Sequence, residues 1–305
     1  MAVYVPEYYS RFRCVAGDCR HTCCAGWEID IDADTQKAYA AMTGALGEAV
    51  RASLVAHEGG VHFATDKNGR CAHLDENGLC RIISAAGEGA LCHICREHPR
   101  FFNTVGDHTL CGLGAVCETA AALLLDAFDY TSLFSCEGEG TPASLCDADL
   151  TPHAALFAAL QDNTLPFTAR LAEIREKFAG GLYLPPREWR RLFASLEYLD
   201  KKNKKRFQRA WRFAAREGLF AVSGEHALLC ERFLAYLFYR HVMPTAGGRE
   251  TCLATAVALV LLTVFAALLA AGETPVVAAR TVSEELEYSE ENTEAIFFAL
   301  DLQLL

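Results

Sequence analysis

The sequence predicts a mainly α-helical protein in two domains: a cysteine-rich N-terminal domain of short hairpin or loop elements, and a helical C-terminal domain. Twelve of the fourteen cysteines lie in the first 146 residues. A stretch rich in Gly, Pro, Ser and acids, residues 136–152, is typical of a linker. The 305 residues, 52% of them hydrophobic, are enough for two folded cores. We therefore predict domains at 1–150 and 151–305.

The cysteines follow a short-spaced pattern. The pattern begins with C-x4-C-x3-C-C and continues with C-x8-C, C-x2-C and C-x5-C. Thiolates at such spacings suit zinc and iron–sulfur clusters equally well. Disulfides and simply buried thiols are the two alternatives. The N-terminus, MAVYVPEYYS, lacks a basic segment followed by an apolar one. We therefore expect a cytoplasmic protein, where reduced cysteines favour metal or cluster binding.

Local signals place several elements in the N-terminal half. Asp32 or Asp34 can cap a helix that runs to about His57, with glycines in its middle that weaken it. Two Asn-Gly turns, at 66–69 and 75–78, each precede a cysteine within two residues. A hairpin or pair of loops would then present both thiols to one metal.

A strongly basic segment, residues 201–216, carries eight Lys or Arg and no acid. It is either a docking surface for an acidic protein or a phosphate, or a solvated helix face with aromatic residues packed inward. The aromatic candidates are Phe207, Trp211 and Phe213. The whole chain has a net charge of −11, which argues against nucleic acid as a partner.

The uncharged segment 252–271 is long enough to span a membrane. Its many alanines and the lack of a flanking aromatic belt favour a helix buried in the core. A glycine-rich nucleotide loop after a strand is missing. Gly112-Leu113-Gly114 matches it only weakly and without a predicted strand, so a doubly wound nucleotide-binding domain is not expected.

The segment VPEYYSRFRCVAGDCRHTCCAGWEIDID resembles the N-terminus of the flagellin lysine-N-methylase family, which also carries the cysteine signature of zinc- or iron-chelating proteins. The resemblance continues in GRCAHLDENGLCRI and LCHICREHPRFF, and again in CERFLAYLFYRHV and SEELEYSEENTEAI. Two positions depart from the family pattern. Glu118 replaces a proline, and Tyr288 replaces a histidine.

The resemblance implies an enzyme that uses S-adenosylmethionine to methylate lysines of flagellin and that carries an iron–sulfur cluster, of the 4Fe-4S type, or zinc. The cluster would serve as a structural staple, an anchor for the donor or a radical initiator, in that order of preference. The implied ligands are Cys14, Cys19, Cys23, Cys24, Cys71, Cys80, Cys92, Cys95 and Cys117. Nine thiols exceed one four-thiolate site, so there are two sites or some of the thiols do not ligate.

Methyl transfer to lysine requires loss of the ammonium proton, whose ordinary pKa is about 10.4. Side chains that could assist occur in the family-like C-terminal segments: Glu231, Tyr236, Arg240 and His241, with Glu287, Tyr288 and Asn292 as further candidates. On a helix, Tyr236 and Arg240 lie one turn apart on one face. The alternative is that these residues only tie two helices together. A non-enzymatic zinc- or iron-binding interaction module is the alternative for the whole chain.

Overall fold

The computed structural model describes residues 2–127, 129–136, 142–148, 151–182, 186–217 and 224–304. It consists of two compact units, a smaller one of Arg13–Arg100 and a larger one of Met1–Phe12 with Phe101–Leu305. The domain boundary predicted near residue 150 falls inside the larger unit. The division lies at Phe12 and Arg100 instead.

Strand pairing explains why the first residues belong to the larger unit. β1 (Ala2–Pro6) runs parallel to β5 (His108–Leu113) and antiparallel to β6 (Ser132–Ser135). It is the middle strand of a five-stranded sheet of order β4-β5-β1-β6-β7. The first residues of the chain thus form a central strand, held by residues more than 100 positions away.

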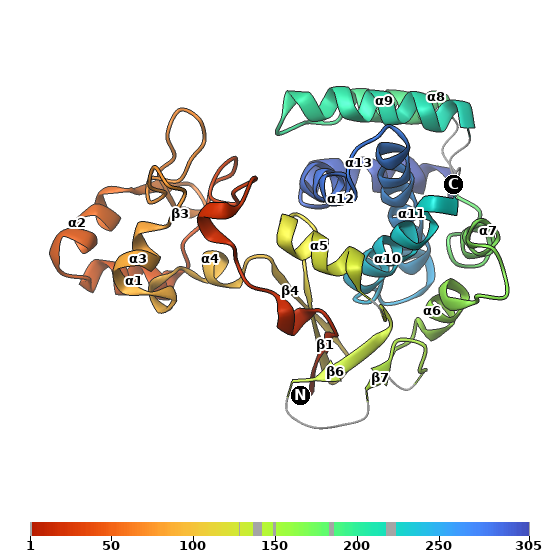
Figure 1. The fold of residues 1–305 in the computed structure, drawn as a ribbon, viewed down its shortest axis with the longest axis horizontal. Coiled ribbons are helices and arrows are strands. Elements are labelled where there is room, and N and C mark those ends of the chain that lie inside the picture. The colour runs from red at the N-terminus through yellow and green to blue at the C-terminus, as the bar shows by residue number, and fades with distance from the viewer. Residues whose placement is uncertain are drawn as a thin grey trace. The chain divides into compact units, whose positions relative to one another are not determined.

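The larger unit is otherwise helical, and most of the thirteen α-helices in the described part of the chain lie here, which agrees with the predicted mainly α class (Figure 1). Its remaining elements are β4 (Arg100–Val105), α5 (Glu118–Asp126), β7 (Ala143–Ser144), α6 (Ala154–Gln161), α7 (Phe167–Phe178), α8 (Pro186–Ser195), α9 (Lys201–Glu217), α10 (Ala227–Leu237), η5 (Phe238–Val242), α11 (Gly248–Ala270), α12 (Pro275–Val282), η6 (Ser283–Glu287) and α13 (Glu290–Asp301). Short 3-10 turns join some of them.

The long apolar helix α11 forms the centre of the larger unit. It packs against α7, α9, α10, α12 and α13. It is the one helix in the described part of the chain that is long and apolar enough to cross a membrane, and 89% of its most apolar window is buried within the protein. Burial on all sides explains why its apolar residues show no stripe. The structure therefore matches the core helix that the sequence favoured for residues 252–271.

The smaller unit is built from short elements: α1 (Ala33–Ala41), α2 (Gly44–Ala52), β2 (Leu54–His57), β3 (Gly60–Phe63), α3 (Arg81–Ala86) and α4 (His93–Glu97). The carboxylate of Asp32 caps α1 by accepting from the Thr35 backbone N–H at 2.9 Å, as predicted. The single helix expected to reach His57 is two helices, because the chain breaks at Gly44, whose φ is +77°. His57 itself lies in a strand.

Two equivalent turns carry thiols in the smaller unit, as the sequence suggested. Asp66 Oδ1 accepts from the backbone N–H groups of Asn68 and Arg70, at 2.7 and 3.0 Å. Asp75 Oδ1 accepts in the same way from the two residues at the equivalent positions. Each turn closes on an isolated bridge that includes a cysteine, Cys71 in the first and Cys80 in the second. The aspartates therefore fix where these thiols lie.

We expect truncation of Phe265, in the middle of α11, to lower the free energy of unfolding by about 3–5 kcal/mol in Phe265→Ala. This ring is fully buried, with its centroid 4.3 Å from that of Phe233. Urea denaturation followed by circular dichroism measures the change. Phe298, 63% exposed on α13, supplies the control. Phe298→Ala should stay within about 0.5 kcal/mol of the unmodified protein, and an equal loss in both variants would contradict the central position of α11.

Candidate functional site

Two π-helical turns define the candidate site in the larger unit. α10 runs directly into η5 (Phe238–Val242), in which the Met243 N–H donates to the Phe238 carbonyl at 3.0 Å. α12 runs directly into η6 (Ser283–Glu287), in which the Tyr288 N–H donates to the Ser283 carbonyl at 2.9 Å. π-helical turns are rare and occur frequently at functional sites, because they shift side chains out of the regular helical register.

A proline follows the first π-turn and leaves two of its carbonyls without a backbone donor. Pro244 has no N–H that could donate to the carbonyls of Tyr239 and Arg240. The side-chain amide of Asn103, on β4, donates to both, at 3.2 and 2.9 Å. The end of the helix is therefore satisfied by a strand of the sheet rather than by its own backbone, and this fixes Arg240 in place.

The second π-turn is satisfied in a similar way from the start of α13. Asn292 donates through its amide to the Glu285 carbonyl at 2.6 Å. Thr293 donates through its hydroxyl to the Leu286 carbonyl at 2.6 Å. These two bonds hold the backbone of the two residues just before Glu287.

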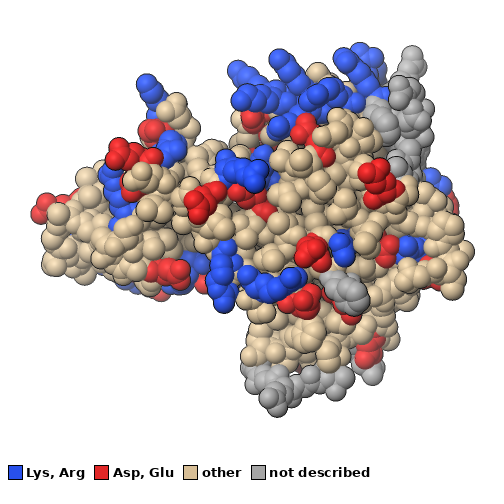
Figure 2. Space-filling view, in the orientation of Figure 1, with Lys and Arg blue, Asp and Glu red and all other residues tan. Residues whose placement is uncertain are grey.

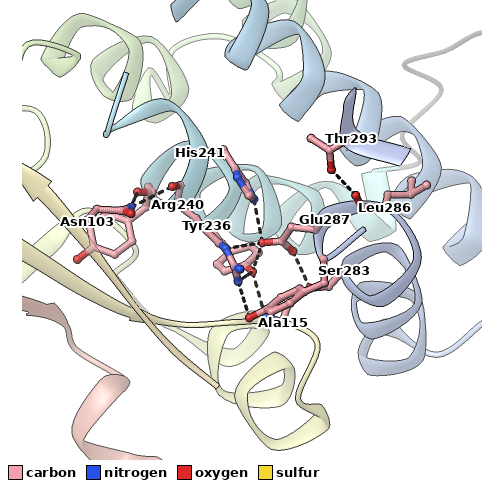
Figure 3. A network of polar contacts seen from close by, with 11 residues as sticks. Asn103, Ala115, Tyr236, Arg240, His241, Ser283, Leu286, Glu287 and Thr293 are labelled. Atoms are coloured by element: carbon pink, nitrogen blue, oxygen red, sulfur yellow. Dashed lines mark hydrogen bonds and ion pairs between the residues drawn. The ribbon is translucent and has the colours of Figure 1, made fainter. Parts of the chain in front are cut away.

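The carboxylate of Glu287 lies at the centre of the polar network between the two turns (Figure 3). Its Oε1 accepts from Tyr236 Oη at 2.5 Å and contacts Arg240 Nε and His241 Nε2, both at 2.9 Å. Ser283 Oγ donates to Oε2 at 2.6 Å. Four side chains thus hold one fully buried carboxylate.

The loop between β5 and α5 closes the network on another side. The backbone N–H of Ala115 donates to Tyr236 Oη at 3.0 Å. The neighbouring Gly114 lies so close to Arg240 that an added Cβ would stand 2.8 Å from Nη1 and would overlap the hydroxyl of Tyr288. A glycine is therefore required here by close approach.

This loop corrects one expectation from the sequence. No strand is predicted at Gly112-Leu113-Gly114, yet Gly112 and Leu113 form the end of β5, and Gly114 begins the short loop that leads into α5. Non-local pairing of β5 with β1 stabilises the strand, and no pattern within the segment itself could show that.

The charge of Glu287 is compensated inside the protein. Burial by itself would raise the pKa of this carboxyl, but the Arg240 guanidinium and the hydrogen bonds from His241 and Ser283 outweigh burial and lower it to about 2. Arg240 Nη1 also donates to the hydroxyl of Tyr288 at 2.8 Å. The guanidinium carbon lies 4.3 Å from the centroid of the Tyr288 ring and 4.9 Å from that of Phe101.

His241 is the network member best placed to exchange a proton. Because the Glu287 carboxylate is ionised, it can only accept, so the hydrogen on the facing Nε2 belongs to the histidine. In the neutral ring Nδ1 is then the acceptor, and no described residue donates to it. The side chain is 32% exposed, whereas the carboxylate is fully buried. This arrangement orients a base toward the surface, as a carboxylate orients histidine in many hydrolases.

Three of the four predicted catalytic residues therefore meet at one place, and the fourth does not. Tyr236, Arg240 and His241 join Glu287, and the predicted helical pairing is present, with Arg240 Nη1 3.1 Å from Tyr236 Oη. Glu231 instead pairs with Arg170 of α7 at 2.7 Å, and the Tyr130 hydroxyl donates to it. It ties helices together in a second buried network.

The thiols of the smaller unit converge from four segments. Cys24 hydrogen-bonds to its neighbour Cys23, and Cys92 hydrogen-bonds to Cys95 within α4 and its cap. Each of these bonds lowers the pKa of one partner, Cys24 or Cys92, to about 7. A thiolate at either position would be a competent metal ligand.

The pKa values of Cys71, Cys80 and Cys95 are raised, so these thiols are harder to ionise. Burial, and then the charges of neighbouring thiolates, raise the pKa of Cys71 and Cys80. The hydrogen bond to Cys92, followed by burial, raises that of Cys95. The negative charges of neighbouring thiolates repel one another, and a bound cation stabilises the thiolates by offsetting that repulsion. The donor chemistry thus suits a thiophilic metal, although no described group of three or more Cys, His, Asp or Glu stands in a ligating arrangement.

The remaining predicted ligands are Cys14, Cys19 and Cys117. Cys14 and Cys19 flank the 3-10 turn η2 (Ala16–Asp18), where Cys19 Sγ donates to the His21 carbonyl at 3.1 Å. Cys117 belongs to the larger unit, where it is the N-cap of α5. The structure shows interactions among six of the predicted thiol ligands: Cys23, Cys24, Cys71, Cys80, Cys92 and Cys95.

Sequence reasoning missed several parts of the site. Ser283 lies four residues before Glu287, a helical spacing that could have suggested a contact. Asn103 gave no signal, because its role depends on strand β4 lying beside η5. Gly114 was noted for a nucleotide loop, whereas it is needed here for close approach to Arg240.

We expect Glu287→Gln to destabilise the larger unit by about 3 kcal/mol at neutral pH, because Arg240 would remain buried without its partner. A carboxyl with a pKa lowered to about 2 contributes stability above its unfolded pKa, and that contribution is lost as pH falls through about 2. The difference between the unmodified protein and the variant should therefore shrink below about pH 4.5. Urea denaturation at several pH values measures it. Glu290→Gln, exposed on α13, should show no such pH dependence.

We expect Gly114→Ala to destabilise the larger unit by about 1–3 kcal/mol, because the new methyl would overlap the Tyr288 hydroxyl. Tyr288→Phe removes the overlapping oxygen and should recover part of the loss in the double variant. Thermal denaturation of the single and double variants gives the coupling energy. Strictly additive losses would show that Gly114 and Tyr288 do not interact in this way.

Comparison with known proteins gives relatives of one kind. A lysine-N-methylase of Salmonella typhimurium is 29% identical over 139 residues, which are 44% of this chain and 35% of the relative. A lysine-N-methylase of Salmonella choleraesuis is 30% identical over 142 residues, with the same shares. The flagellar biosynthetic protein FliU of Salmonella muenchen is 28% identical over 139 residues, 44% of this chain and 82% of the relative.

The match to each of the two lysine-N-methylases covers about a third of its length. No family model matches the chain. No solved structure matches it either. These relatives, two named lysine-N-methylase and one named for flagellar biosynthesis, agree with the resemblance to the flagellin lysine-N-methylase family.

Proposed function

We propose that this chain is a protein-lysine N-methyltransferase that modifies a flagellar protein, flagellin, in the cytoplasm, with S-adenosylmethionine as the methyl donor. The names of the relatives support the reaction and the flagellar substrate. The observation that carries the proposal is the buried Glu287 carboxylate with His241 directed from it toward the surface. Methyl transfer to an amine needs a group that removes a proton, and this pair is suited to do so.

The proton would move from the lysine to Nδ1 of His241. Glu287 fixes the orientation of the ring through the bond at Nε2 and stabilises the imidazolium that forms. Ser283 and Tyr236 keep the carboxylate from turning, because each donates to one of its two oxygens. The nitrogen of the resulting neutral amine has the lone pair that attacks the donor's methyl group.

The charge balance of the site also favours a neutral lysine. An uncompensated carboxylate beside the substrate would stabilise the ammonium form and raise its pKa. Arg240, 2.9 Å from the same oxygen that His241 contacts, removes that effect. The Tyr288 ring, 41% exposed, forms an apolar edge of the network that can contact the methylene chain of a lysine.

We further propose that the smaller unit holds an iron–sulfur cluster, with zinc as the alternative. The supporting observation is the group of six interacting thiols, from which four ligands can be drawn, with Cys24 and Cys92 the two most readily ionised. A bound cluster would supply a rigid tie among the four thiol-bearing segments. The proposed proton transfer takes place in the other unit and does not depend on this metal.

The proposed function predicts that His241→Gln lowers the rate of methyl transfer by about 10²–10⁴ with little change in KM for the protein substrate. The assay uses purified flagellar protein and S-adenosylmethionine, and mass spectrometry measures methylated lysine. The control, His57→Gln, removes a histidine of the smaller unit that pairs with Asp30 at 3.0 Å. An unmodified protein that forms no methyl-lysine contradicts the proposed function, and equal rates in all three proteins contradict the role of His241.

The proposed cluster predicts iron with acid-labile sulfide in protein purified without oxygen. Cys24→Ser and Cys92→Ser should lose most of both, because they remove the thiols that ionise most readily. Cys252→Ser in α11 removes a thiol outside the group and should retain both. Zinc without sulfide would favour the alternative metal. Unchanged metal content in all three variants would show that the thiol group of the smaller unit is not the ligand set.

A further inference from the structure

The described surface of the larger unit carries a concentrated positive charge along two neighbouring helices, α8 and α9. Figure 2 shows Lys and Arg gathered over these helices, whose positions appear in Figure 1. We call the exposed cations here the basic ridge: Arg190, Arg191, Lys201, Lys202, Lys205, Arg209 and Arg212. Such a concentration stands out in a chain whose net charge is −11.

Within the part of the chain that the structure describes, little of this charge is neutralised. Glu273, at the start of the turn before α12, contacts Arg206 at 3.2 Å and Arg209 at 3.6 Å. No described carboxylate forms an ion pair with Lys201, Lys202 or Lys205. Positions 201, 205 and 209 are four apart, so like charges lie on one face of the helix, and this destabilises the isolated helix. An acidic ligand would relieve that repulsion.

The geometry of α9 argues against a membrane as the ligand. Helices that insert into a membrane surface need a free apolar face beside the basic one. The apolar side of α9 is already used, because Phe207 and Ala210 are each 2% exposed and pack toward α11. The side chains of Trp211 and Phe213, expected to point inward, lie outside the described residues.

The ridge is fixed to the π-turn that carries the candidate site. Glu285, 1% exposed and two residues before Glu287, accepts from the backbone N–H groups of Leu199 and Asp200 at 2.8 and 3.1 Å. It also accepts from the side-chain amide of Asn203, on α9, at 2.7 Å. A buried carboxylate thus holds the N-terminus of α9 to η6. The cations therefore lie on a helix whose position is fixed. This helix is hydrogen-bonded to η6, the π-helical turn that carries Glu287 of the candidate site.

We infer that the basic ridge is a docking surface for an acidic segment of a partner protein. The inference does not depend on methyl transfer, because it rests on the charge, packing and attachment of α8 and α9. A flexible segment rich in Asp and Glu would meet several exposed cations at once. Binding of this kind associates quickly and weakens as salt is added.

The test measures binding of a fluorescein-labelled peptide of alternating Glu and Ser to the full chain by fluorescence anisotropy. The triple variant Lys201→Glu, Lys202→Glu, Lys205→Glu should weaken binding at least about tenfold. The matched control, Lys37→Glu, Lys67→Glu, Lys177→Glu, makes the same change in net charge at exposed positions elsewhere. It should bind nearly as well as the unmodified chain. Circular dichroism checks that both variants remain folded.

Three results would overturn the inference. The first is no detectable binding of the acidic peptide by the unmodified chain at low salt. The second is equal weakening by the ridge variant and the matched control, since it would attribute binding to net charge alone. The third is tighter binding to duplex DNA, or to vesicles containing phosphatidylserine, than to the peptide. Loss of peptide binding in the ridge variant together with retained binding in the control supports it.

Discussion

The buried carboxylate of Glu287 is the constraint on which the candidate site depends. A carboxylate at this depth is stable only when other groups compensate its charge and its lone pairs. Arg240 supplies the charge, while Tyr236, His241 and Ser283 supply hydrogen bonds. Each of these partners comes from one of the two π-turns or from the helix leading into it. The need to compensate the Glu287 carboxylate therefore fixes the position of α10 and η5 relative to α12 and η6.

The surrounding elements stabilise these turns in matched ways. Asn103 satisfies the carbonyls left open before Pro244, and Asn292 and Thr293 satisfy those of the two residues just before Glu287. Further out, α11 provides the apolar core on which α10, η5 and α12 pack. Glu285 extends the second turn to the basic helix α9. Polar side chains at the ends of helices thus connect the sheet, the candidate site and the ridge.

Local patterns in the sequence predicted much of the fold. The cap at Asp32, the two cysteine-bearing turns and the buried helix at 252–271 are all determined by nearby residues, and the structure contains them. The central strand β1 was not foreseen, because its stability comes from pairing with residues far along the chain. The domain boundary was misplaced for the same reason.

The site was predicted in part. Tyr236, Arg240 and His241 were identified through resemblance and helical spacing, and they do converge. Glu231 was grouped with them because it is close in sequence, yet its side chain leaves α10 in another direction and meets Arg170. Such contacts depend on which helices pack against each other. Local patterns in a single sequence do not show that packing.

The pH dependence of single-turnover methyl transfer tests the central claim most directly, namely that His241, oriented by Glu287, accepts the substrate's proton. In the unmodified protein the rate at neutral pH should exceed the rate in His241→Gln, because the variant lacks the group that removes the proton from lysine. In His241→Gln the rate should rise only as pH approaches the range in which free lysine loses its proton, near 10.4. Equal rates at neutral pH in the two proteins would contradict the account and place the base elsewhere.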